Sequence, residues 1–262
     1  VNVRHPWPVS ARHIIGQFLP DLVMGCLAKA VPDRVPAEGA ACLWGAQLRG
    51  GPSIDPGAAQ KGNRVGAPFD TIFFNSGGSG GRPFADGMSA TAFPSGVRAL
   101  PVEVVETVAP VVVWRKELRP DSAGAGRHRG GLGQIVEVGT IDGSPMGVFA
   151  MFDRVASAPR GRAGGANGAS GRVELGSGVP LKAMGFQTVP ADDRLRLSLP
   201  GGAGWGDPLE RPAAKVAADV ADGIIAPAAA ARDYGVVLDA TGAVDAPATG
   251  AARAKLRRAE TS

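Results

Sequence analysis

Residues Pro101–Gly133 have the sequence PVEVVETVAPVVVWRKELRPDSAGAGRHRGGLG. The segment contains two valine-rich runs, Val102–Val108 and Val111–Leu118, which are typical of β-strands because β-branched residues pack well on a pleated sheet. Pro110 separates the runs and has no N–H to donate to a ladder, so we expect it at a strand edge or in a turn. A loop rich in arginine and glycine follows at Arg119–Arg129, and we call it the arginine loop. The segment therefore predicts β-structure that leads into a charged loop.

More short strands are predicted on both sides of this segment. They are Thr71–Phe74, a pair formed by Gln134–Ile141 and Gly147–Phe152 across an Asp142–Gly143 turn, and Arg194–Leu199, in which leucines alternate with polar residues. A further β-like stretch lies within Gly39–Gly50. The chain has 39 glycines and 22 prolines in 262 residues, which favours long loops and short strands over long helices.

Helices are predicted near the two ends of the chain. Ser10 is suited to cap a helix over residues 11–17, and Pro20 to open the next one. Near the C-terminus, helices are expected over Pro212–Asp222 and Pro227–Tyr234, the second ending at Gly235. The fold class predicted is therefore α+β, with mostly short mixed β-strands, glycine-rich loops, and helices near the N-terminus and the C-terminus.

The last part of the chain has a different composition. Residues 240–262 are rich in alanine, glycine, threonine and proline and end in Arg253, Lys255, Arg257 and Arg258. Such a segment is typical of a mobile basic tail. The predicted domain accordingly covers residues 1–239.

Three long segments carry a resemblance to a known family. They are NVRHPWPVSARHIIGQFLPDLVMGCLAKAVPDRVPAEG at residues 2–39, NSGGSGGRPFADGMSATAFPSGVRALPVEVVE at 75–106 and PGGAGWGDPLERPAAKVAADVADGIIAPAAAARDYGVVL at 200–238. Together with the arginine loop they resemble the hydantoinase B/5-oxoprolinase family, and in particular the C-terminal half of an N-methylhydantoinase B or oxoprolinase B-type subunit. Family members are longer, and their front half has no counterpart here. We therefore expect either a fragment or a separately encoded half.

The resemblance implies a function that needs partners. A hydantoinase A-type subunit would bind ATP and activate the carbonyl of a lactam or imide by phosphorylation, and the B subunit would complete the ring opening of this small cyclic amide. The resemblance places a divalent metal in the missing N-terminal half of the B subunit, and we expect no cofactor bound by this chain alone. The isolated chain is expected to be inactive and the hetero-oligomer to be cytoplasmic. Two alternatives stay open: a non-catalytic assembly module, and a subunit of a related acetone-carboxylase-type enzyme.

No catalytic residue is assigned from the sequence. Candidates for substrate binding or for an interface are Arg82, Asp86, Arg119, Asp121, Arg127, His128, Arg129 and His13. Arginine offers forked donors that match a carboxylate or a phosphate. The same arginines can instead pair with acids across a subunit contact, while Asp121 and Ser122 cap the turn. We favour this structural or interface role, because such loops more often organise backbone than carry out chemistry.

Several classes of site are excluded or disfavoured by the sequence. It has no G-x-x-x-x-G-K-[ST] motif for a nucleotide and no Cys/His cluster for a metal, and Cys26 and Cys42 are expected to be buried free thiols. The net charge of +4 without a clustered basic motif argues against nucleic acid. The longest apolar stretch, Leu19–Val31, is interrupted by charge and too short to span a membrane.

Ser79 lies in Gly77–Gly81, which formally matches the G-x-S-x-G pattern of a nucleophile elbow. That motif needs a following helix and a later histidine, and His128 is the only histidine after Ser79. A glycine loop whose backbone closely approaches a ligand or another strand explains the pattern better.

Overall fold

The computed structural model describes residues 16–52, 54, 65–91 and 93–260. Within them the chain forms two antiparallel sheets of four strands each. The first, in the order β2-β1-β5-β7, consists of β1 (Leu43–Gly50), β2 (Phe69–Ser76), β5 (Met146–Met151) and β7 (Met184–Val189). The second, in the order β3-β4-β8-β6, consists of β3 (Val111–Leu118), β4 (Gln134–Thr140), β6 (Arg172–Leu175) and β8 (Leu195–Ser198). Together with helices near both ends, the sheets confirm the predicted α+β class.

The main hydrophobic core takes buried side chains from both sheets. Trp44 of β1 is fully buried, packs against Phe152 with ring centroids 4.8 Å apart, and donates from its indole N–H to the Asp153 carbonyl. In β8, Leu195 and Leu197 are fully buried. The alternation predicted for this strand is therefore confirmed.

Residues Val102–Val108 form a helix, α3, and the prediction of a strand there is wrong. Only Val105 is buried, where it joins the main core. The Glu106 carboxylate accepts a hydrogen bond from the Val113 N–H in β3 and so ties the helix to the strand that follows. Valine has a high β-propensity, but one buried position and a polar anchor suit a single short helix better, and this tertiary context overrides the propensity.

Strands β4 and β5 do not pair, so the predicted hairpin is also wrong. The turn itself exists: Gly143 has a φ of +69°, and the Asp142 carboxylate accepts a hydrogen bond from the Ser144 N–H. It carries the chain from the second sheet to the first, where β5 pairs with β1 and β7. A crossing between layers and a hairpin use the same turn residues, so the local sequence does not distinguish them.

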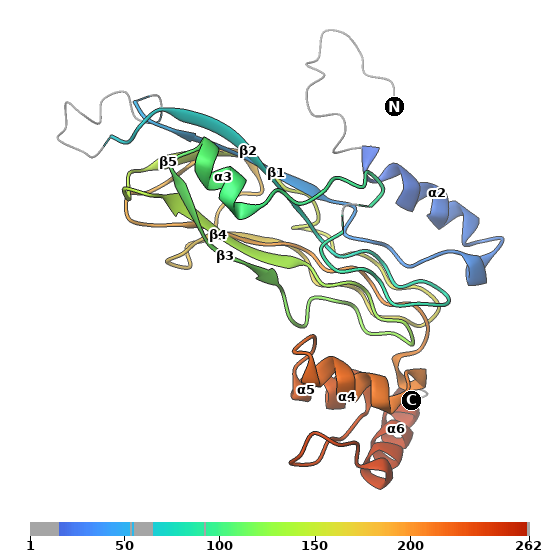
Figure 1. Cartoon of the computed structure of the whole chain (residues 1–262). Helices are drawn as coiled ribbons and strands as arrows, with labels where there is room; N and C mark the ends of the chain where they lie inside the picture. The colour runs from blue at the N-terminus through green and yellow to red at the C-terminus, as the bar shows by residue number, and fades with distance from the viewer. Residues whose placement is uncertain (1–15, 53, 55–64, 92, 261–262) are drawn as a thin grey trace.

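Five extended segments run side by side between the sheets and the C-terminal helices (Figure 1): residues 36–42, 77–91, 121–133, 159–169 and 199–206. We call this region the glycine bundle. Its backbones bond to one another outside regular strands, as from Gly131 N–H to the Ser79 carbonyl. A Cβ on Gly202 would lie 1.9 Å from that same Ser79 oxygen, and one on Gly130 would lie 1.9 Å from the Gly202 oxygen. Only glycine permits such an approach, as at the axis of collagen.

The C-terminal helices form a second, smaller core. They are the 3₁₀ turn η2 (Pro208–Glu210) and the helices α4 (Ala213–Ala221), α5 (Pro227–Tyr234) and α6 (Ala246–Glu260). Val216 and Tyr234 are buried in this core. Asp207 caps η2 by accepting from the Leu209 N–H. Gly235 ends α5 in the left-handed conformation, as predicted.

Helix α6 lies where a mobile tail is predicted over residues 240–262, and the structure corrects that prediction for residues 246–260. The guanidinium of Arg253 donates to the Tyr234 carbonyl at 3.1 Å and to the Arg211 carbonyl at 2.6 Å. By donating to these two carbonyls, Arg253 fixes α6 against α5. The small-residue composition gave no indication of this contact.

The N-terminal part of the described chain contains helix α2 (Leu19–Leu27) and the 3₁₀ turn η1 (Pro32–Arg34). Pro20 lies in the first turn of α2, as predicted. Cys42 is a buried free thiol as predicted, whereas Cys26 on α2 is exposed, contrary to the prediction. Residues 11–15 of the helix expected over 11–17 lie outside the described residues. No helix in the described part of the chain is both long and apolar enough to span a membrane.

Candidate functional site

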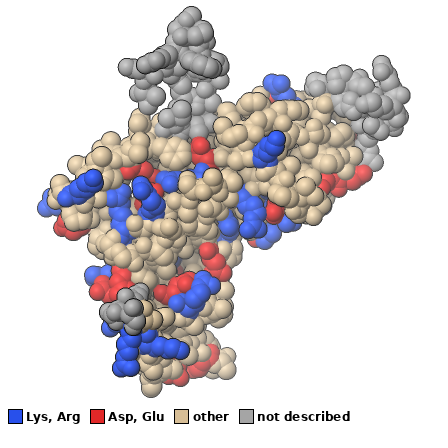
Figure 2. All heavy atoms as spheres, turned by 180° about the vertical axis from the view of Figure 1, so that it is seen from behind, with Lys and Arg blue, Asp and Glu red and all other residues tan. Residues whose placement is uncertain are grey.

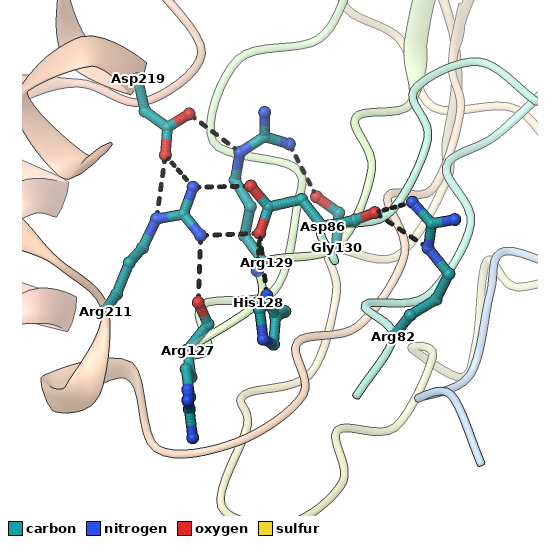
Figure 3. A network of polar contacts seen from close by, with 8 residues as sticks. All are labelled: Arg82, Asp86, Arg127, His128, Arg129, Gly130, Arg211 and Asp219. Carbon is teal, nitrogen blue, oxygen red and sulfur yellow. Dashed lines mark hydrogen bonds and ion pairs between the residues drawn. The ribbon is translucent and has the colours of Figure 1, made fainter. Parts of the chain in front are cut away.

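Arg211 lies at the centre of a buried ion cluster that joins the glycine bundle to α4 (Figure 3). Its guanidinium contacts Asp86 in a bidentate manner at 2.7 and 2.8 Å and donates to one oxygen of Asp219 at 2.8 and 3.2 Å. Arg129 donates from Nε to the other Asp219 oxygen at 3.1 Å and from its backbone N–H to Asp86. We call Arg211, Asp86, Asp219 and Arg129 the Arg211 cluster.

The electrostatics of the Arg211 cluster favour the charged states of Asp86 and Arg211. Burial acts to raise the pKa of Asp86, but the hydrogen bonds and charge of Arg211, with Arg129, outweigh it and hold that pKa below its ordinary value. Burial also acts to lower the pKa of Arg211, but Asp86 and Asp219 together raise it. A fully paired cluster of this kind fixes the relative position of two elements.

A second ion cluster lies under α2. The Arg154 guanidinium contacts Asp21 at 3.3 Å and Glu38 at 3.1 Å, and Arg160 pairs with the other Glu38 oxygen at 2.6 Å. We call Asp21, Glu38, Arg154 and Arg160 the Asp21 cluster. Arg154 has a φ of +60°, an uncommon conformation for a side chain of this size, and its buried Nε has no hydrogen-bond partner in the described structure.

The two carboxylates of the Asp21 cluster have opposite pKa shifts. Burial raises the pKa of Asp21 from 3.8 to about 6, because it outweighs the opposing charge of Arg154. Burial also acts to raise the pKa of Glu38, but the hydrogen bonds from Arg160 outweigh it and hold that pKa below its ordinary value. Asp21 can therefore take up or release a proton near neutral pH, a property common at functional sites.

Two cavities meet at Asp21. The larger, of about 660 Å³, lies between α2 and the Asp21 cluster and is lined in part by Phe18, Leu22 and Lys29. The smaller, of about 260 Å³, lies against the glycine bundle and includes Ser79, Arg82 and Met88 in its lining. Asp21 lines both cavities. A titratable carboxyl group between two cavities is the arrangement in the described chain that best suits a reaction.

Comparison with known proteins decides the family. A sequence model of the hydantoinase B/oxoprolinase family matches residues 1–208. The chain belongs to the hydantoinase B/oxoprolinase family. Within this family it is 30% identical over 252 residues to a putative D-/L-hydantoinase B-type subunit from a Pseudomonas species, and the match covers 93% of this chain and 40% of that protein.

Two solved structures extend the comparison. The crystal structure of the ATP-dependent caprolactamase from Pseudomonas jessenii matches 87% of this chain and 40% of its own chain, with a TM-score of 0.71 and 28% identity. A nucleotide-free acetone carboxylase structure matches 87% of this chain and 34% of its own, with a TM-score of 0.66 and 24% identity. The second similarity shows a shared fold alone. This member of the hydantoinase B/oxoprolinase family thus spans two fifths or less of the relatives named here.

The structure brings some of the predicted site residues together. Arg129 and Asp86 belong to the Arg211 cluster, and the His128 imidazole lies 3.9 Å from Asp86. Burial, with neighbouring cations, lowers the pKa of His128 in spite of Asp86. Arg82 donates twice to the Asp86 carbonyl and also lines the smaller cavity.

The side chains of Arg119, Asp121 and Arg127 lie apart from both clusters, and only the backbone carbonyl of Arg127 reaches one of them, where it accepts from Arg211 at 3.2 Å (Figure 3). Arg119 donates to the carbonyls of Ser170 and Leu199, and the Asp121 carboxylate accepts from the Ala226 N–H at the start of α5. The side chain of Arg127 is exposed and lies 3.8 Å from Glu210. His13 lies outside the described residues. The contacts of Arg119 and Asp121 organise backbone, and whether Arg127 serves an interface stays a prediction.

Sequence reasoning missed the residues at the centre of each cluster. All four lie in segments quoted for the family resemblance without a role. Of them, Asp219 lies within the helix predicted over Pro212–Asp222 and Arg211 directly before it. A charged residue inside an otherwise apolar helical stretch, as Asp21 is in α2, was the available signal, because charges are seldom buried without a partner.

The remaining expectations concern a metal, the Ser79 hydroxyl and nucleic acid. No three His, Cys, Asp or Glu side chains come together as a metal site in the described residues, so this part of the chain does not fit the divalent metal implied by the resemblance. The Ser79 hydroxyl accepts a hydrogen bond from the Met88 N–H at 2.7 Å. One face of the molecule carries basic and acidic side chains interspersed over the sheets and bundle (Figure 2), which is not the pattern of a nucleic-acid surface.

Proposed function

We propose that this chain works as part of the B subunit of an ATP-dependent cyclic amide hydrolase. The observation that carries the proposal is the family match over residues 1–208, supported by the structural similarity to an ATP-dependent caprolactamase. The proposed partners are an A-type ATPase subunit and the part of the B subunit that corresponds to the remainder of the longer relatives. Because the reaction consumes ATP, the proposed location is the cytoplasm.

In the proposed reaction, the A-type partner transfers the terminal phosphoryl group of ATP to the carbonyl oxygen of a lactam or imide. The carbonyl carbon then becomes a stronger electrophile, water adds to it, and the ring C–N bond breaks while the nitrogen takes up a proton. Loss of the ring nitrogen leaves an acyl phosphate, which a second water molecule hydrolyses to the carboxylate and phosphate. Overall, the cyclic amide, ATP and two water molecules yield ADP, phosphate and the opened acid. Any divalent metal would lie outside the described residues, and no step here depends on it.

This chain would contribute positioning and proton handling. Asp21 can accept a hydrogen bond or a proton near neutral pH, since burial has raised its pKa to about 6. The Arg211 cluster would keep the loop that bears Arg82 and Asp86 fixed against the C-terminal helices. A rigid support of this type keeps binding groups within reach of a reacting atom.

Co-purification followed by an activity assay tests the proposal. The chain is expressed with the gene products encoded beside it, and the complex is assayed for ATP-dependent opening of 5-oxoproline, hydantoin and ε-caprolactam, with and without a divalent metal. We expect a complex whose ATP hydrolysis depends on one of these cyclic amides. Acetone with bicarbonate is assayed in parallel.

Three results would overturn the proposal. ATP hydrolysis that depends on acetone and bicarbonate would assign the chain to an acetone-carboxylase-type enzyme. Partner subunits that still open cyclic amides without this chain but no longer assemble stably would make it an assembly module. A chain that stays folded but alone beside those partners would remove the enzymatic assignment.

A further inference from the structure

The smaller cavity at Asp21 has the size and lining of a site for a small organic molecule. Its volume of about 260 Å³ lies just below the range of about 300–1,000 Å³ common for drug-sized ligands. One part of the wall is apolar and consists of Pro36, Met88 and Phe93. Met88 and Phe93 are 49% and 38% exposed, so apolar surface remains open to an occupant. Apolar walls with a few polar groups are typical of ligand sites.

The polar part of the wall offers both donors and an acceptor. Ser79 Oγ accepts from the Met88 N–H, so its own hydrogen is directed elsewhere. Arg82 uses Nε and Nη2 on the Asp86 carbonyl, which leaves other N–H groups of its five for a ligand (Figure 3). Asp21 also lines this cavity, and its carboxylate is the acceptor among the lining side chains.

The glycine bundle makes the cavity possible. Gly39 and Gly80 belong to its lining, and their backbones approach each other so closely that a Cβ on Gly39 would lie 3.4 Å from the Gly80 nitrogen. A Cβ on Gly80 would lie 1.9 Å from the Ala37 carbonyl oxygen. At these two glycines the wall is bare backbone, which lets a ligand come close to the chain there.

A cyclic amide complements this wall group by group. Its methylene groups match Pro36, Met88 and Phe93, its carbonyl oxygen accepts from Ser79 or Arg82, and its ring N–H donates to Asp21. We propose that the smaller cavity binds the ring of the cyclic amide substrate, with the carbonyl directed toward Ser79 and Arg82 and the ring nitrogen toward Asp21. The inference rests on the proposed function, because it assigns the substrate of that function to a place in this chain. The raised pKa of Asp21 supports it, since the group is ionised and able to accept above about pH 6.

The first test fills the cavity. In the complete complex, Met88→Trp is compared with Met184→Trp, which introduces the same side chain at an exposed position of β7 away from the cavity. We expect Met88→Trp to raise KM at least tenfold for ε-caprolactam and less for the smaller ring 2-pyrrolidone, while Met184→Trp leaves both unchanged. Equal KM values in the two variants would overturn the inference.

The second test removes the donor. Ser79→Ala is compared with Ser89→Ala, because each hydroxyl accepts one backbone N–H, from Met88 and Leu132 respectively, while Ser79 alone lines the cavity. Loss of one neutral hydrogen bond to the carbonyl is expected to raise KM about two- to tenfold. An effect of the same size in Ser89→Ala would assign the loss to loop structure and count against the inference.

Direct binding separates this inference from the proposed function. Ligand-observed NMR records the binding of ε-caprolactam, 2-pyrrolidone and hydantoin to the complex and to its Met88→Trp variant. Binding that Met88→Trp abolishes supports the cavity assignment even if no turnover occurs, in which case only the proposed reaction fails. An active complex in which Met88→Trp binds as the wild type does retains the reaction and overturns the cavity assignment. Absence of binding to the wild-type complex overturns the cavity assignment.

Discussion

In the Arg211 cluster both carboxylates face arginines inside the protein, whereas in the Asp21 cluster one carboxyl group faces two cavities. Burial opposes ionisation at Asp86 and at Asp21 alike, yet their pKa values move in opposite directions. The difference lies in the pairing with arginine: Asp86 has a bidentate pair at 2.7 and 2.8 Å, whereas Asp21 has one contact with Arg154 at 3.3 Å and a backbone hydrogen bond from Gly39. Bidentate pairing therefore makes the Arg211 cluster a structural joint, by which we mean a contact that holds the glycine bundle against α4. Incomplete pairing leaves Asp21 titratable.

The largest effect is expected from breaking the structural joint. Arg211→Met leaves Asp86 and Asp219 buried without their main cation, and we expect the free energy of unfolding to fall by about 3–5 kcal/mol. Denaturant unfolding of the full chain measures the loss. The double variant Arg211→Met/Asp219→Asn should recover part of it. A loss below about 1 kcal/mol in the single variant would show that the cluster is not a structural joint.

Asp21 should affect stability in a pH-dependent manner. Its pKa is raised from 3.8 to about 6 in the folded state, so between these values the folded chain holds more protons than the unfolded chain. The stability contributed by the neutral carboxyl is complete below pH 3.8 and is lost as pH rises toward about 6, by about 3 kcal/mol in all. Asp21→Asn stays neutral, so the variant should gain stability relative to the wild type as the pH rises from 4 to 8.

Thermal unfolding of wild type and Asp21→Asn at several pH values measures this difference. Asp86 and Glu38 have lowered pKa values, so both proteins lose the stability that these carboxylates contribute as the pH falls. The quantity compared is therefore the difference in stability between the two proteins at each pH. A difference that does not vary with pH would contradict the raised pKa of Asp21.

The glycine bundle should tolerate no added side chain. Gly202→Ala places a Cβ 1.9 Å from the Ser79 carbonyl oxygen, and we expect a loss of about 1–3 kcal/mol through backbone displacement. Gly250→Ala is the matched control, since nothing lies within 4 Å of its Cβ and it belongs to helix α6. That control should gain about 0.5–1 kcal/mol. Denaturation midpoints that fall equally for both would mean that the bundle is not closely packed.

The smallest effect on stability is expected at Arg127. Its side chain is exposed and 3.8 Å from an exposed Glu210, so Arg127→Ala should change the free energy of unfolding by less than about 1 kcal/mol. If the arginine loop is an interface, the same variant should weaken co-purification with the A-type partner. Reduced turnover in a complex that remains assembled would favour a binding or catalytic role instead.

The sequence predicted elements where a local signal is sufficient. The alternating leucines of β8, Pro20 in α2 and Gly235 after α5 each express a single local rule, and all three were predicted correctly. Helix α3 and the crossing between β4 and β5 were predicted wrongly. Whether a run of valines forms a helix or a strand, and whether a turn joins paired strands or two sheets, depends on contacts distant in the chain.

The same reasoning explains what was missed in the two clusters. The contact between Asp86 and Arg211 spans 125 positions in the sequence, and that between Asp21 and Arg154 spans 133. No periodicity or motif links residues so far apart. The arginine loop was found because its composition is local, and Asp86 was named as a candidate, but the pairing of the loop with Asp86 and Asp219 could not be identified before the fold was known.

The pH dependence of cyclic amide hydrolysis by the complete complex tests the role of Asp21 most directly. We compare kcat/KM of wild type and Asp21→Asn for the same cyclic amide between pH 5 and pH 9, with complex formation checked by co-purification. The account predicts that kcat/KM of the wild type falls below about pH 6, and that Asp21→Asn assembles normally but loses this acidic limb together with most of its activity. An assembled Asp21→Asn complex with the wild-type profile would contradict the assignment of Asp21 to the reaction.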